Sequence, residues 1–132
     1  MKTIKIGKDR ELLFNVRAMK EIKKQYGSLE AMETAITGSD DAFGALEDIA
    51  KIVTILINAA ILRKNADIDF GFAQGEKDQL LTAEVVENYL DLETIQQFPA
   101  VFAEILSGGY KSDIPQAEET DEVLKEIDAK NA

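Results

Sequence analysis

The chain has 132 residues, the length of a single domain, and its 25 acidic against 15 basic side chains give it a formal net charge of −10. This charge argues against binding to nucleic acid or to an anionic membrane surface, because both require clustered basic residues. Cysteine and histidine are absent, which excludes disulfides, thiolate zinc sites, cysteine nucleophiles and an imidazole base. Composition therefore favours an acidic protein that is not an enzyme.

The first residues predict a short β-hairpin. Polar and apolar residues alternate in Thr3–Ile6, residues 7–10 have the composition of a turn, and an apolar run resumes at Leu12–Phe14. A hairpin of two strands is only marginally stable in water, so we expect it to pack on the rest of the domain. The lysines at the start have no long apolar run behind them, which argues against a signal peptide.

The pattern then changes to a helical period, which predicts two helices. The apolar face of the first comprises Ala18, Met19, Ile22 and Tyr26. Gly27 fits a C-terminal stop, and Ser28 fits the N-cap of a second, shorter helix. Residues 37–41 form a break, in which Asp40 and Asp41 are interpreted as cap residues rather than as a catalytic carboxylate pair.

The longest predicted helix covers residues 42–64 and is apolar on nearly every side. Its main stripe comprises Leu46, Ile49, Ile52, Val53, Leu56, Ala60 and Ile61. Ile55, Ile57 and Leu62 add apolar side chains outside that stripe. Such a helix must be covered almost all round, by the chain's own helices or by a partner, so we predict these three residues to be partner-binding. Its apolar stretch is about half of the ~20 residues that a bilayer requires.

Residues 65–81 are predicted to form a polar loop that contains Gly71 and Gly75. Phe70 and Phe72 lie in this loop, where a large ring is difficult to bury. Exposed aromatic side chains are typical anchors for protein partners. We therefore add Phe70 and Phe72 to the candidate partner-binding residues.

Two further helices are predicted beyond the loop. Thr82 fits the N-cap of a helix over residues 83–90, and Asp91 fits a cap just beyond it. From Phe98 the apolar residues follow a helical stripe, with Pro99 in the first turn and a glycine pair as the stop.

The C-terminal segment Ser112–Ala132 holds seven acidic residues, two lysines and few apolar residues. This composition predicts a solvated, disordered tail. The alternative is a docking segment that folds on a partner, in which Val123, Leu124 and Ile127 form one helical turn and contact that partner. The predicted organisation is a folded domain over residues 1–111, followed by the acidic tail over residues 112–132.

One segment has the outline of a calcium loop. Asn65, Asp67 and Asp69 occupy ligand positions 1, 3 and 5, and Glu76 falls at position 12. Position 6 requires glycine for a sharp turn, but Phe70 occupies it, so we predict a polar loop without a metal ion. The chain also lacks the glycine motifs of phosphate loops and the serine–lysine motif of hydrolases. We therefore predict no catalytic residue and no cofactor.

Five segments follow one another in a characteristic order and spacing: Lys2–Ile6, Phe14–Ile22, Tyr26–Glu30, Leu46–Leu62 and Leu81–Asp91. This order resembles the tail assembly chaperones of long-tailed phages and prophages of Gram-positive bacteria, over roughly residues 2–107. The resemblance implies a non-enzymatic protein of the bacterial host cytoplasm that binds the long tape measure protein, keeps it soluble and promotes assembly of tail tube subunits around it. It also implies absence from the mature virion. Covering a long apolar client would suit a homo-oligomer with spare apolar surface.

The predicted fold is mainly α (α+β), with a short N-terminal β-hairpin packed on a helical bundle and an acidic C-terminal tail. The predicted function is that of a phage tail assembly chaperone, with the tape measure protein and the tail tube protein as partners and without nucleic acid, membrane, metal or cofactor. The alternative is a small acidic regulator that mimics nucleic acid or blocks a host protein.

Overall fold

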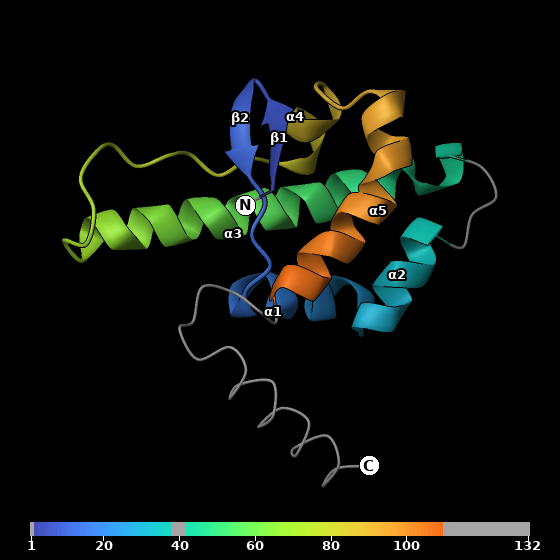
Figure 1. Ribbon diagram of the computed structural model, residues 1–132, viewed down its shortest axis with the longest axis horizontal. Helices are drawn as coiled ribbons and strands as arrows, with labels where there is room; N and C mark the ends of the chain where they lie inside the picture. Colours follow the sequence, from blue (N-terminus) through green and yellow to red (C-terminus); the bar gives the residue numbers. More distant parts are fainter. Residues whose placement is uncertain (1, 38–41, 110–132) are drawn as a thin grey trace, which may run out of the picture.

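The computed structural model describes residues 2–37 and 42–109, with the backbone alone described at residues 42, 43 and 109 (Figure 1). The elements in these ranges are β1 (Thr3–Ile6), β2 (Lys8–Glu11), α1 (Val16–Tyr26), α2 (Leu29–Thr37), the 3-10 helix η1 (Ala42–Ala45), α3 (Leu46–Asp69), α4 (Ala83–Glu87) and α5 (Leu92–Gly109). The prediction of a mainly α fold with a small N-terminal hairpin is confirmed. No described helix combines the length and the apolar character that crossing a bilayer demands.

The hairpin forms, but its second strand is not the predicted one. β1 and β2 pair antiparallel, with Ile6 opposite Lys8, so the reversal takes place at Gly7. Gly7 has a φ of 76°, a left-handed conformation that glycine adopts without a steric penalty. Because the chain reverses there, the residues predicted as the turn become the strand. Leu12 follows the strand directly and is buried in the core.

The two helices after the hairpin form, and the boundary between them lies at Gly27 and Ser28, as predicted. The Asn15 side chain accepts a hydrogen bond from the Ala18 amide at 3.0 Å and caps α1. α1 ends at Gly27, which has a φ of 88°. The Ser28 hydroxyl accepts from the Ala31 amide at 3.0 Å and caps α2. The local sequence signals therefore set both boundaries.

α3 continues five residues beyond its predicted end at residue 64. A Schellman motif closes it: the Gly71 amide donates to the Ile68 carbonyl at 3.2 Å, and the Phe72 amide donates to the Asp67 carbonyl at 2.7 Å. Gly71 has a φ of 79°, as this cap requires. The prediction of a loop from residue 65 was wrong, because the polar residues after Lys64 lie on the solvent-facing end of the helix and only Gly71 stops it.

The last two helices also differ from their predicted bounds. α4 ends at Glu87, three residues early. α5 begins at Leu92, six residues before Phe98, and the Asp91 carboxylate caps it by accepting from the Thr94 amide at 2.8 Å. Pro99 therefore lies inside the helix rather than in its first turn, because the stronger cap signal at Asp91 starts the helix earlier.

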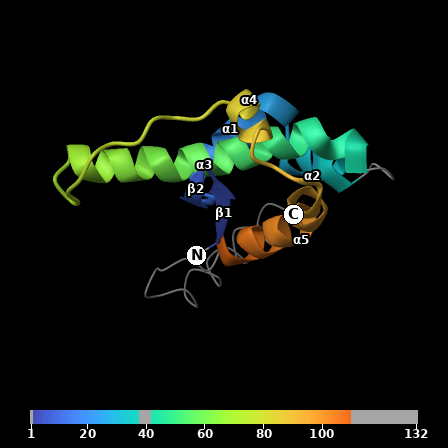
Figure 2. The same cartoon turned by 90° about the horizontal axis from the view of Figure 1, so that it is seen from above.

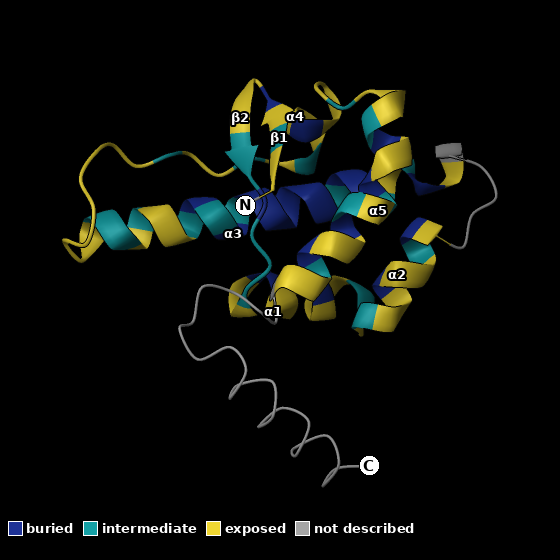
Figure 3. Ribbon diagram, in the orientation of Figure 1, coloured by how far each residue is buried: buried dark blue, intermediate teal, exposed yellow. Residues whose placement is uncertain are grey.

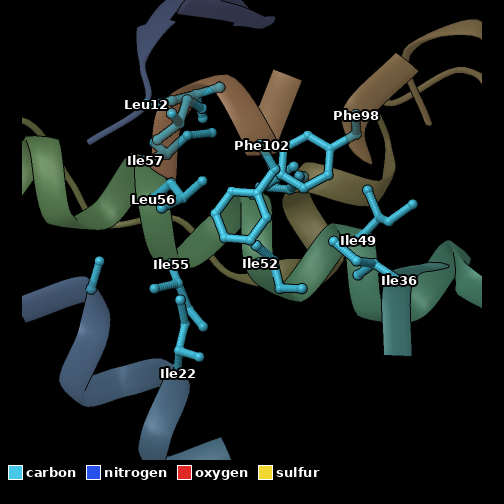
Figure 4. Packing of buried hydrophobic residues seen from close by; sticks show 14 of the residues in the cluster. Leu12, Ile22, Ile36, Ile49, Ile52, Ile55, Leu56, Ile57, Phe98 and Phe102 are labelled. Atoms are coloured by element: carbon cyan, nitrogen blue, oxygen red, sulfur yellow. The ribbon is translucent and has the colours of Figure 1, made fainter. Parts of the chain in front are cut away.

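The core is built around α3, which the hairpin, α1, α4 and α5 surround (Figures 1 and 2). The middle of α3 is buried, while its C-terminal end extends into solvent (Figure 3). Phe98 and Phe102 of α5 stack with ring centroids 5.6 Å apart and lie over Ile49 and Ile52 of α3 (Figure 4). The rings of Phe14 and Phe102 pack edge to face with their centroids 6.2 Å apart, and this contact connects the segment after the hairpin to α5.

Candidate functional site

An apolar groove lies along the outer side of α1 and encloses about 470 Å³. Its apolar lining comprises Phe14, Val16, Met19, Ile22 and Leu29. Ile22 is buried and forms part of the core, whereas Val16 is 71% and Met19 is 44% exposed. We call this feature the α1 groove. The sequence placed Met19 on the buried face of the helix; the structure instead exposes much of its side chain to solvent.

The edge of the α1 groove is positively charged, although the whole chain is acidic. Lys20 and Lys23 line the groove, and Arg17 and Lys24 follow the same helix. Glu21 is the single acidic residue of α1. Within the described ranges, no carboxylate forms an ion pair with Lys20 or Lys23. The groove therefore offers a ligand an apolar floor and, as far as the described residues go, lysines without an ion-pair partner.

A second exposed apolar feature lies at the C-terminal end of α3. Phe70 is 76% and Phe72 is 81% exposed. Phe72 follows Gly71 in the Schellman motif, a position whose apolar side chain commonly packs back on the helix. Here the corresponding helix residue is Asp67, which offers no apolar contact. The exposure of both rings agrees with the prediction that they are difficult to bury in this segment. Neither ring packs on the helix to stabilise the Schellman motif.

The segment after these phenylalanines is fixed to α3 by two asparagines. The Asn65 side chain accepts from the Asp78 amide and donates to the Asp78 carbonyl, both at 3.0 Å. Asn58 makes the same pair of bonds with Leu81, at 2.8 and 2.9 Å. The returning chain runs beside α3 in both views (Figures 1 and 2). Sequence reasoning missed this function; the signal was two asparagines seven residues apart, on one face of the helix.

Asp78 also connects three parts of the chain through its carboxylate. It accepts a hydrogen bond from Lys64 of α3 at 2.9 Å and lies 3.4 Å from the ammonium of Lys8 in β2. The hydrogen bond from Lys64 is the main reason why the pKa of Asp78 lies below its ordinary value. These contacts hold the hairpin, α3 and the returning segment in register.

Two of the predicted partner-binding residues are core residues. Ile55 and Ile57 are buried by the chain's own elements, with Ile22 of α1 below Ile55 and Leu12 beside Ile57 (Figure 4). Their assignment to a partner surface is therefore corrected: the chain itself covers the apolar excess of α3. Leu62 is half-buried at the edge of a smaller cavity of about 270 Å³ between α1 and α3. Val123, Leu124 and Ile127 lie outside the described residues, as do Asp40 and Asp41.

The segment whose spacing resembles a calcium loop begins within the C-terminal end of α3. The backbone of Asn65, Asp67 and Asp69 belongs to α3, and the Asn65 side chain is already bound to the backbone of Asp78. Asp69 forms an ion pair with Lys77 at 2.5 Å. In residues 2–37 and 42–109, no group of three acidic side chains is close enough to hold a metal ion.

Comparison with protein-family models, with curated proteins and with solved structures gave no match to this chain. The resemblance to phage tail assembly chaperones therefore remains a prediction from the sequence.

Proposed function

We propose that this protein is a non-enzymatic phage tail assembly chaperone that binds the tape measure protein and promotes assembly of the tail tube around it. The observation that supports this proposal is the α1 groove, an apolar surface that the described residues leave open although they cover the core around α3. Exposed apolar patches of this kind, with a polar rim, are typical of protein-binding sites. The resemblance of residues 2–107 supports the same role.

The shape and charge of the groove favour a helical client. α1 has 11 residues and is therefore about 16 Å long, which matches roughly three turns of a second helix. A helix that docks in such a groove presents apolar residues at positions i, i+3 or i+4, and i+7. Lys20 and Lys23 at the edge favour acidic residues beside that stripe. The preferred client segment is thus an amphipathic helix with acidic flanks.

A chaperone of this kind meets a physical need of tail assembly. A long helical polypeptide that waits for its tube exposes apolar surface and tends to aggregate. Many copies of a chain with a net charge of −10 would cover that surface and keep the complex in solution by mutual repulsion. On this proposal the protein acts in the bacterial host cytoplasm, assembles as a homo-oligomer on its client and leaves before the virion is complete. Phe70 and Phe72 provide a second contact point, for the client or for a tail tube subunit.

The test is co-expression with the tape measure protein that the proposal names as the client. We expect the wild-type chain to raise the soluble amount of that protein and to co-purify with it. Replacing Val16 and Met19 by Glu places two charges in the groove, and it should weaken co-purification roughly tenfold or more. Val85→Glu is the matched control, because Val85 is 41% exposed on α4, away from the groove. A client that is equally insoluble with and without the wild-type chain would contradict the proposal.

A further inference from the structure

We propose that the α1 groove has an occupant within the same chain: residues 120–128 of the acidic C-terminal segment dock in it and compete with the client. The docking is an independent claim, whereas its regulatory meaning rests on the proposed function. Three observations carry it: the chemistry of the groove, the residue pattern of the segment, and the position at which the described chain ends.

The residue pattern of the segment matches the groove. Val123, Leu124 and Ile127 follow the spacing i, i+1 and i+4, which places all three on one side of a helical turn. Residues 120–128 contain the acidic residues Asp121, Glu122, Glu126 and Asp128 and one lysine, Lys125, and Glu118 and Glu119 precede them. The segment therefore supplies one turn of the amphipathic, acid-flanked pattern that an apolar groove with a lysine edge favours, and Lys130 stands where a further apolar residue at i+7 would lie.

The charges of the two elements are complementary. α1 carries four basic residues and one acidic residue, and its lysines at the groove have no ion-pair partner among the described residues. Ser112–Ala132 carries seven acidic residues and two lysines. The most basic of the described helices and the acidic C-terminal segment therefore attract each other, and salt should weaken this attraction.

The segment is long enough to reach the groove. Phe102 of α5 contacts Phe14, which is itself part of the groove lining. α5 ends at Gly109, seven residues or about 10 Å beyond Phe102. The 13 residues from 110 to 122 can span up to about 43 Å when extended, so they allow Val123 to meet α1. A tether of this length gives an effective concentration in the millimolar range, and a weak contact is then sufficient for occupancy.

Docking of the segment would regulate access to the groove. A client must displace the segment. Its apparent affinity is therefore the affinity for the open groove multiplied by the fraction of chains whose groove is open. Other proteins that offer only isolated apolar contacts would bind too weakly to displace the segment. A long client, to which many copies of the chain bind side by side, would displace it. The groove would therefore be covered in the free protein and open on the client.

The composition of the chain makes the docking directly measurable in the full-length protein. It has no cysteine and three methionines, of which Met19 lines the groove and Met32 is fully buried in α2. We would label methionine methyl groups with ¹³C and attach a nitroxide at Ala129→Cys. We expect the Met19 methyl signal to lose most of its intensity when the nitroxide is oxidised and to recover when it is reduced. The double substitution Leu124→Asp and Ile127→Asp should largely abolish that loss.

A matched control separates docking from a general charge effect. Ile114→Asp makes the same chemical change in the acidic segment, outside residues 120–128, and should leave the loss of the Met19 signal in place. An unchanged Met32 signal would report that the core is intact. The proposal is overturned if the nitroxide does not affect Met19, or if Ile114→Asp acts like the double substitution. It is also overturned if a mixture of nitroxide-bearing and ¹³C-labelled chains gives the full effect, since a second copy would then be the occupant.

These measurements use no client, so they decide the docking whether or not the chaperone proposal holds. The regulatory consequence has its own test: the double substitution should increase affinity for the client several-fold, and Ile114→Asp should not. If the client fails to bind any variant, the proposed function fails while the docking result stands. If the client binds every variant equally, the segment docks without regulating the groove, and the regulatory part is overturned.

Discussion

The side chain of Asn58 and the backbone of Leu81 exchange two hydrogen bonds, as two residues do in an antiparallel sheet. Asn65 repeats this arrangement with Asp78. Seven residues of helix rise about 10.5 Å, and the three steps from Asp78 to Leu81 cover about 10 Å when extended. The spacings match, so one helix face serves as the edge on which the returning segment is aligned.

The first prediction concerns this alignment. Asn58→Ala removes both bonds and leaves the Leu81 amide and carbonyl without their partner, which should lower the free energy of unfolding by about 1–3 kcal/mol. Urea denaturation measures the change. Asn88→Ala is the control, because the Asn88 side chain makes one exposed bond to the Glu84 carbonyl, and its loss should cost no more than about 0.5 kcal/mol. Equal effects of the two substitutions would contradict the role assigned to Asn58.

The second prediction concerns the contact between α1 and α3. The Tyr26 hydroxyl donates to the Asp48 carboxylate at 2.8 Å, and burial, together with this bond, raises the pKa of Tyr26 above its ordinary value of 10.0. The neutral phenol stabilises the fold, so its contribution is complete below pH 10 and is lost as the pH rises further. We expect the free energy of unfolding to fall more steeply above pH 10 in the wild type than in Tyr26→Phe. At pH 7 the substitution should cost about 1 kcal/mol.

The third prediction concerns the carboxylate of Asp78. Because its pKa is lowered in the folded state, its stabilising contribution is present above pH 4 and is lost as the pH falls below its ordinary value of 3.8. We expect Asp78→Asn to lower stability at pH 7 by up to about 1 kcal/mol and to differ less from the wild type near pH 3. Urea midpoints measured between pH 7 and pH 3 provide the test. A constant difference over that range would show that the charge of Asp78 is not responsible.

The sequence was informative wherever a local signal decides the structure. The caps predicted at Ser28, Thr82 and Asp91 depend on short-range hydrogen bonds, and all three form. The second strand was missed because Lys8–Glu11 contains no apolar residue. The alternation of polar and apolar residues that indicates a strand is therefore absent. The reversal of the chain at Gly7 sets the pairing of this strand, and a periodic pattern of apolar residues does not reveal such a turn.

In the candidate site, too, the features set by local sequence could be predicted, and those set by tertiary packing could not. The exposure of Phe70 and Phe72 follows from local sequence, because neighbouring polar residues and glycines give large rings nothing to pack on. Ile55 and Ile57 were misassigned because the covering of α3 depends on where α1 and the hairpin pack, which is a tertiary property. The α1 groove was missed for the same reason: Met19 fits a helical stripe, and only the packing of α1 shows that its side chain stays partly open.

The fourth prediction tests the helix end that presents the two phenylalanines. Gly71 adopts a φ of 79°, and a side chain there is disfavoured by about 1–2 kcal/mol in the left-handed region. No atom lies within 4 Å of the position that a Cβ would occupy, so the cost is conformational rather than a clash. Gly71→Ala should therefore lower the free energy of unfolding by about 1 kcal/mol, whereas Gly108→Ala, in open space within α5, should not lower it, because alanine is the better helix former. Because the Schellman bonds of Gly71 and Phe72 set the direction in which the chain leaves α3, the Ala variant should also change the proteolysis rate between Phe70 and Lys77. A variant as stable and as protease-resistant as the wild type would mean that the helix end does not depend on this cap.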